Sequence, residues 1–234
     1  MLIKKVLIYG EGPTDVGTVD PYGNWSQGCI VRLLQKINPQ ISLEFIKPPH
    51  KKEITQINTL KKKGQPRLEG HAKIIQKLFI YAGMHEMKYD IIAYYGDTDR
   101  ETGTRNSEVQ ARSASRDAYN EAVSAFSFLR INGIPIIPLR MLESWLLSDP
   151  EAFLKAFNRR VTLPGRPELL WGDRHNPNSD FPKNKLQKIL ESIGQSASRE
   201  TFCEIVENIN IDTMEKNCPI SFPPFIEKAQ ELLR

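Results

Sequence analysis

Runs of apolar residues alternate along the chain with stretches of helical periodicity. Apolar or β-branched runs, each followed by turn residues, predict strands at residues 5–9, 41–45, 90–95 and 134–139. Apolar side chains that recur every three or four positions predict helices at residues 24–37, 68–79 and 111–129, with residues 17–23 as a flexible approach to the first. This alternation is typical of a parallel sheet covered by helices.

The predicted fold class is therefore α/β, a four-stranded parallel sheet flanked by helices. The expected order places the second strand beside the first, the first beside the third, and the third beside the fourth. The second strand is closed by Pro48 and Pro49, and the fourth contains Pro135 and Pro138. Because proline donates no ladder hydrogen bond, the second strand is expected at or near the edge of the sheet, and the fourth either at the edge or with only a few ladder hydrogen bonds.

The last third of the chain has a different pattern, in which short helical segments are separated by loops. Helices are predicted at residues 150–157, 183–193, 199–209 and 222–233, with a long loop over residues 164–182. We expect a core at residues 1–149 and a helical C-terminal extension at residues 150–234 that packs on this core.

Composition excludes several classes of protein. The 234 residues, 40% of them hydrophobic, can bury a sizeable core. Cys29, Cys203 and Cys218 are far apart and form no Cys-x-x-Cys pair, so neither a disulfide framework nor a zinc site is expected. The chain has no apolar stretch approaching about 18 residues and no signal-like N-terminus. We expect a cytoplasmic protein with no membrane contact.

The chain has a net charge of +4, and its basic residues are most concentrated in one segment. Residues 47–73 carry two acidic side chains, Glu53 and Glu69, and eight basic ones: Lys47, Lys51, Lys52, Lys61, Lys62, Lys63, Arg67 and Lys73. One interpretation is a solvated loop. The other is a flap that follows the phosphates of a nucleic acid, with an affinity that falls steeply with salt.

Acidic residues follow three of the four predicted strands. Glu11 comes after the first strand, Asp97 and Asp99 after the third, and Glu143 just past the fourth. The carboxyl ends of parallel strands share one edge of a sheet, so these side chains are expected to meet there. Clustered carboxylates repel one another unless cations lie between them, which predicts one or two Mg²⁺ or Mn²⁺ ions.

Other interpretations of these residues stay open at this point. Asp97 and Asp99 are also compatible with a turn or helix cap, and Glu143 with an acid that favours a helix N-terminus. The pair also matches the metal-binding Asp-x-Asp of a nucleotide-sugar glycosyltransferase, although that leaves Glu11 unexplained. A non-catalytic module that binds nucleic acid or a protein partner through its basic segment is a third alternative.

Two short motifs carry a resemblance to a known family. The strings Gly10-Glu11-Gly12-Pro13-Thr14-Asp15 and Gly96-Asp97-Thr98-Asp99-Arg100 resemble the Glu and Asp-x-Asp motifs of Toprim domains. These domains occur in topoisomerases, primases and nucleases of the overcoming-lysogenization-defect type. The string from Pro138 to Asp149 resembles short Toprim-like proteins found beside ATPase genes in bacterial defence loci. The resemblance covers about the first 150 positions.

The resemblance implies a metal-dependent nuclease that cuts DNA or RNA by a two-metal mechanism, with an ATPase protein as a partner in antiviral defence. Glu11 would be a metal ligand or general base, Asp97 and Asp99 would bind metal, and Glu143 would complete the site. For the cation that faces the developing negative charge on the phosphate, our candidates are Lys183 and Lys185.

Further side chains receive smaller roles. Asp15 is expected to be an outer group of the metal site, and Trp171 to stack on a base or dock a partner. Trp25 and Trp145 are expected on apolar helix faces in the core. The histidines show no ligand-like spacing and are expected in loops or at the surface, with two conceivable phosphate contacts: His71 and His175.

Overall fold

The computed structural model describes residues 3–10, 12–59, 68–98 and 107–234. Within these residues the main sheet is parallel and four-stranded, in the order β4-β1-β5-β6. Its strands are β1 (Ile3–Tyr9), β4 (Ser42–Ile46), β5 (Ile91–Tyr95) and β6 (Gly133–Ile136). The predicted fold class and strand order are confirmed, and the two proline-flanked strands lie at the edges.

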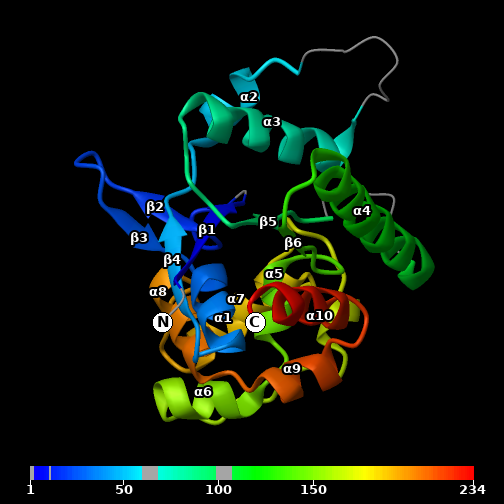
Figure 1. Cartoon of the computed structure of the whole chain (residues 1–234). Coiled ribbons are helices and arrows are strands. Elements are labelled where there is room, and N and C mark those ends of the chain that lie inside the picture. Colours follow the sequence, from blue (N-terminus) through cyan, green and yellow to red (C-terminus); the bar gives the residue numbers. More distant parts are fainter. Residues whose placement is uncertain (1–2, 11, 60–67, 99–106) are drawn as a thin grey trace.

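Helices cover both faces of this sheet (Figure 1). Successive strand residues point to opposite faces, so Tyr95 joins one apolar cluster and Tyr94 the other. The Tyr94 face is covered by α3 (Gly70–Met84) and α4 (Glu108–Leu129). The Tyr95 face is covered by α1 (Cys29–Ile37) and by helices from the C-terminal part of the chain. Burial on both sides explains why every residue of β5 is apolar or aromatic.

The C-terminal helices continue the apolar cluster on the Tyr95 face. They are α5 (Leu142–Leu146), α6 (Pro150–Phe157), α7 (Pro182–Ser192), α8 (Arg199–Asn208), α9 (Ile211–Asn217) and α10 (Phe222–Leu232), with a short 3-10 helix at Pro167–Leu169. Their buried side chains share one cluster with Val6 and Ile8 of β1. The division of the chain at residue 149 stays a prediction. In the described residues, no helix combines the length and apolar character needed to cross a bilayer.

The predicted helix at residues 24–37 begins too early. Residues 17–27 form an antiparallel hairpin of β2 (Gly17–Val19) and β3 (Trp25–Gln27), and α1 starts only at Cys29. The hairpin turn is closed by Asp20, whose carboxylate accepts hydrogen bonds from backbone N–H groups at 2.8 and 2.9 Å. The prediction was wrong because the four-residue spacing from Trp25 to Cys29 matches the period of a helix. Trp25 is in fact half-buried and lies on a strand.

Two short α-helices, at residues 51–56 and 211–217, were not predicted, nor was the 3-10 helix at Pro167–Leu169. Helix α2 (Lys51–Gln56) lies within the basic segment and begins at a capping box, because His50 accepts from the Lys52 N–H while Glu53 accepts from the His50 N–H. Helix α9 begins at Asn210, which caps the Thr213 N–H. Neither helix is long enough to show a clear apolar period in the sequence.

Candidate functional site

Three segments meet at the carboxyl edge of the main sheet. They are the loop after β1, the residues after β5, and the segment that leads from β6 into α5. The buried hydroxyl of Thr98 links the last two, because it donates a hydrogen bond of 2.6 Å to the carbonyl oxygen of Leu139. Asp97 and Glu143 are thereby held on neighbouring parts of one rim.

The hydroxyl of Tyr95 lies at this rim, in contact with the Asp97 carboxylate. Tyr95 is the last residue of β5, is fully buried, and donates a hydrogen bond to the carboxylate of Asp97. Burial raises the pKa of Tyr95 well above its ordinary value, and the charges of Asp97, Asp15 and Glu143 raise that pKa further. The phenol therefore stays protonated, and three carboxyl groups from three segments lie within electrostatic reach of it.

The loop that carries Asp15 is folded tightly onto the start of α1. The Asp15 N–H donates to the Gly12 carbonyl at 3.2 Å, and the Asp15 carbonyl accepts from the Ile30 N–H at 3.0 Å. Gly28, directly before α1, lies so close that a Cβ there would stand 2.3 Å from the Asp15 carbonyl oxygen. A residue larger than glycine at position 28 would therefore push the Asp15 loop away from the helix.

The acidity of the Asp15 carboxyl group is strongly perturbed. Burial raises the pKa of Asp15 to about 7, and the neighbouring charge of Glu143 contributes in the same direction. The Thr14 hydroxyl and the charge of Lys183 act against this rise. Sequence reasoning assigned Asp15 only an outer role. The available signal was its position in the glycine-bracketed turn after the first strand.

The two candidate lysines differ in their surroundings. Lys183 lies in the first turn of α7 and is close enough to Asp15 to lower the pKa of that carboxyl group. Lys185 instead forms an exposed ion pair with Asp180, with 3.0 Å between Nζ and Oδ1. Between them, the Asn184 amide donates to the Asn176 carbonyl at 2.8 Å and fixes the preceding loop. Lys183 is therefore the lysine whose charge acts on the acidic rim.

Other sequence-predicted residues are placed as follows. His71 is buried on α3, where its ring bonds the Tyr94 hydroxyl at 2.8 Å, so the prediction of a surface histidine that contacts phosphate is wrong. Burial lowers the pKa of His71. Trp171 is half-buried, with the Arg140 guanidinium 4.2 Å from its ring centre and the Phe181 ring 5.7 Å away. Its stacking on a base stays a prediction.

Several predicted residues lie outside the described residues. They are Glu11, Asp99, Arg100 and, in the basic segment, Lys61, Lys62, Lys63 and Arg67. Among the residues that the structure does describe, no three acidic, histidine or cysteine side chains are arranged to hold a metal ion. Asp15, Asp97 and Glu143 offer the hard oxygen donors that Mg²⁺ and Mn²⁺ prefer. A complete ligand set that includes Glu11 and Asp99 stays a prediction.

Asp15→Asn is expected to stabilise the protein most at alkaline pH. The pKa of Asp15 is about 7 in the folded protein and 3.8 in the unfolded chain, so the folded protein binds the proton more tightly. The wild-type protein therefore loses stability as the pH rises from about 4 to about 7. The gain in unfolding free energy should therefore be about 2 kcal/mol larger near pH 8 than near pH 5. Urea denaturation in EDTA at both pH values measures it.

The control for this prediction is Asp20→Asn in the hairpin turn. Hydrogen bonding from Asn24 lowers the pKa of the exposed Asp20, so its removal should give no gain at either pH. Equal gains from Asp15→Asn at both pH values would show that Asp15 is not held partly protonated by the fold.

Comparison with known proteins finds the chain in a family without an assigned activity. A sequence model described as "Domain of unknown function (DUF4276)" matches residues 30–228, a span that includes Asp97, Glu143 and Lys183. No curated protein and no solved structure gives a significant match. Because the matched span covers most of the 234 residues, the chain belongs to the DUF4276 family.

Proposed function

We propose that the chain is a divalent-metal-dependent nuclease that hydrolyses phosphodiester bonds in DNA or RNA. The observation that carries the proposal is the hydrogen bond from the Tyr95 hydroxyl to the Asp97 carboxylate at the carboxyl edge of a parallel sheet, where the charges of Asp15 and Glu143 also act on this hydroxyl. Ligands of open α/β sheets bind at this edge. The resemblance of the two acidic motifs to Toprim motifs supports the same reaction.

Four of the residues that the structure describes have a role in this proposal. Asp97 and Glu143, together with Glu11 and Asp99 by the Toprim resemblance, would hold Mg²⁺ or Mn²⁺, which when bound supplies the hydroxide nucleophile and stabilises the leaving oxygen. Tyr95 orients the Asp97 carboxylate through its hydrogen bond. Lys183 brings a positive charge to the rim, where it would stabilise the negative charge that develops on the phosphate.

The mutual repulsion of the carboxylates supports a cation at this place. Burial and the charge of Glu143 both disfavour ionisation of Asp15, so a rim with all carboxyl groups charged is costly without a counter-ion. A bound divalent cation removes this cost. The resemblance to proteins of bacterial defence loci further supports a cytoplasmic location and an ATPase protein as the partner that controls cleavage.

The test is cleavage by the purified protein. Supercoiled plasmid and tRNA are each incubated with the protein in Mn²⁺, in Mg²⁺ and in EDTA, alone and together with the proposed ATPase partner. We expect cleavage of at least one substrate in Mn²⁺ or Mg²⁺ and its loss in EDTA. An Asp97→Ala protein purified in parallel controls for contaminating nucleases. Equal cleavage by both proteins, or none under any of these conditions, would refute the proposal.

A further inference from the structure

A pocket of about 660 Å³ lies beside the acidic rim, on the side of the edge strand β4. The loop after β1 contributes Gly10 and Gly12 to its lining, and the segment from the end of β4 into α2 forms another part. This is the same β1 loop that carries Asp15. The pocket, which we call the β4 pocket, therefore shares one wall with the proposed site.

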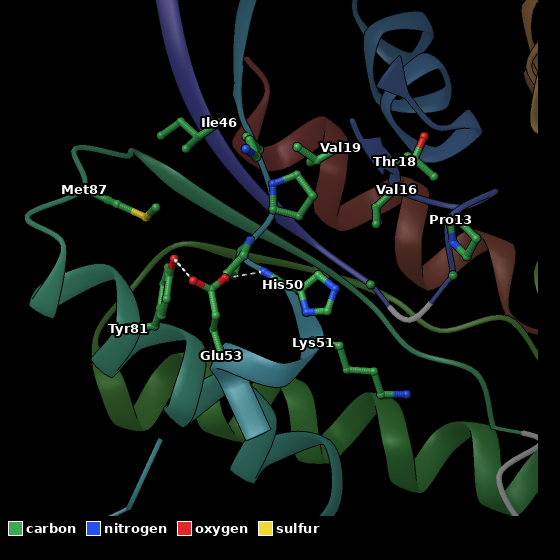
Figure 2. Close-up of a pocket in the computed structure, with 16 residues that line it drawn as sticks. Pro13, Val16, Thr18, Val19, Ile46, His50, Lys51, Glu53, Tyr81 and Met87 are labelled. Carbon is green, nitrogen blue, oxygen red and sulfur yellow. Dashed lines mark hydrogen bonds between the residues drawn. The ribbon is translucent and has the colours of Figure 1, made fainter. Parts of the chain in front are cut away.

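The interior of the β4 pocket is largely apolar. Figure 2 shows Ile46, Val19 and Met87 around it, and Pro48 and Pro49 complete this part of the lining. Its volume lies in the range of about 300–1,000 Å³ that is usual for pockets that hold small organic ligands. Such a surface suits the flat face of a nucleobase.

The polar groups of the β4 pocket are mostly donors and cations. Lys47, His50 and Lys51 line it and are exposed. The carboxylate in the lining, Glu53, already accepts from the His50 N–H at 2.7 Å and from the Tyr81 hydroxyl at 3.4 Å, the two hydrogen bonds drawn in Figure 2. Among the described residues of the lining, the charged side chains other than Glu53 are therefore the positive ones of Lys47 and Lys51, which favours an anionic group such as a phosphate.

The orientation of His50 is set by the capping box of α2. Its Nδ1 accepts from the Lys52 N–H at 3.2 Å, so the neutral ring carries its proton on Nε2. In Figure 2 the ring lies between the start of α2 and the loop that carries Pro13. His50 therefore offers an N–H donor on the side of the pocket formed by the loop that carries Pro13.

We infer that the β4 pocket receives one unpaired nucleotide of the substrate strand. The base would lie against Ile46 and Met87, and its phosphate would contact His50 and Lys51. Stacked and paired bases are not available to such a pocket, whereas a single strand or a splayed-out nucleotide is. This inference rests on the proposed nuclease function and specifies its substrate as single-stranded or locally unpaired nucleic acid.

The test measures binding without cleavage. Labelled single-stranded and duplex oligonucleotides of about eight nucleotides are titrated in EDTA, and anisotropy gives the dissociation constants. Met87→Trp fills the pocket without a change of charge. His50→Asn combined with Lys51→Ala removes the ring and the cation, while Asn keeps a side-chain oxygen for the capping role. Lys216→Ala, on the exposed surface of α9, is the charge-matched control.

We expect the wild-type protein to bind the single strand more tightly than the duplex. Met87→Trp and the double variant should each weaken single-strand binding at least about tenfold, because each loses a base or phosphate contact. Lys216→Ala should bind within about twofold of wild type because its charge is remote from the pocket. Wild-type affinity in both pocket variants, or no single-strand binding by the wild type, would overturn the inference.

Two further comparisons separate the outcomes. Cleavage by Met87→Trp at the wild-type rate would refute the pocket and leave the nuclease intact, whereas pocket-dependent binding without any cleavage in Mn²⁺ would refute the nuclease alone. A free nucleoside monophosphate is then added as competitor. If it binds in a pocket-dependent manner while the strand does not, the occupant is a free nucleotide, and the assignment to the substrate strand is wrong.

Discussion

Asp97→Asn is expected to lower the rate of metal-dependent cleavage at least about a thousandfold, the scale of loss when a charged group of a catalytic site is removed. Asparagine keeps the size of the side chain and an oxygen that accepts the hydrogen bond from Tyr95. It removes the negative charge that would hold the cation. Single-turnover cleavage in Mn²⁺ measures the rate, and the thermal midpoint should stay close to that of the wild type.

The matched control is Asp117→Asn on the exposed side of α4. It makes the same chemical change away from the rim, so its rate should equal that of the wild type. A wild-type rate for Asp97→Asn would remove Asp97 from the site. A large drop in its thermal midpoint would instead mean that the rate loss follows from a damaged fold.

The sheet was predictable because local pattern and topology agree. Strand β5 is a continuous apolar run that ends at Gly96, as expected for a strand buried on both faces. The rules for parallel sheets then leave few orders, and the edge positions follow from prolines beside β4 and within β6. The hairpin before α1 was missed because three-residue strands leave almost no periodic signal.

The site was less predictable because its chemistry depends on tertiary contacts. In the sequence, Asp15 and Asp20 look alike, but Asp15 is half-buried within reach of the charge of Glu143 while Asp20 is exposed, and the pKa values of the two shift in opposite directions. Lys183 and Lys185 stand two positions apart on α7, so they point to different sides of the helix. No local rule says which side faces the rim.

Trp145→Ala is expected to lower the free energy of unfolding by about 3–5 kcal/mol, the usual cost of removing a large buried aromatic side chain. Trp145 is fully buried on α5. Its ring stacks on Phe225 with 5.4 Å between centres and meets Phe222 edge to face at 5.1 Å. Urea denaturation followed by circular dichroism measures the loss.

The indole N–H adds a polar connection to this packing. It donates to the Ser221 hydroxyl at 2.9 Å, and the buried Glu168 carboxylate accepts from the N–H groups of Ser221 and Ile220, both at 2.9 Å. Trp145→Phe keeps most of the side-chain volume and loses this donor together with part of the indole ring, so it should cost less than Trp145→Ala, about 1–2 kcal/mol. An equal loss for both variants would show that the hydrogen bond, and not the ring, stabilises α5.

The position of Trp145 connects this stability prediction to the proposed reaction. Trp145 follows Glu143 by two residues on α5, so packing of Trp145 on α10 also fixes the helix that carries Glu143. Under conditions where Trp145→Ala is still folded, its cleavage rate should fall while the rate of Trp145→Phe stays near that of the wild type. A folded Trp145→Ala protein with wild-type cleavage would show that Glu143 needs no support from the C-terminal helices.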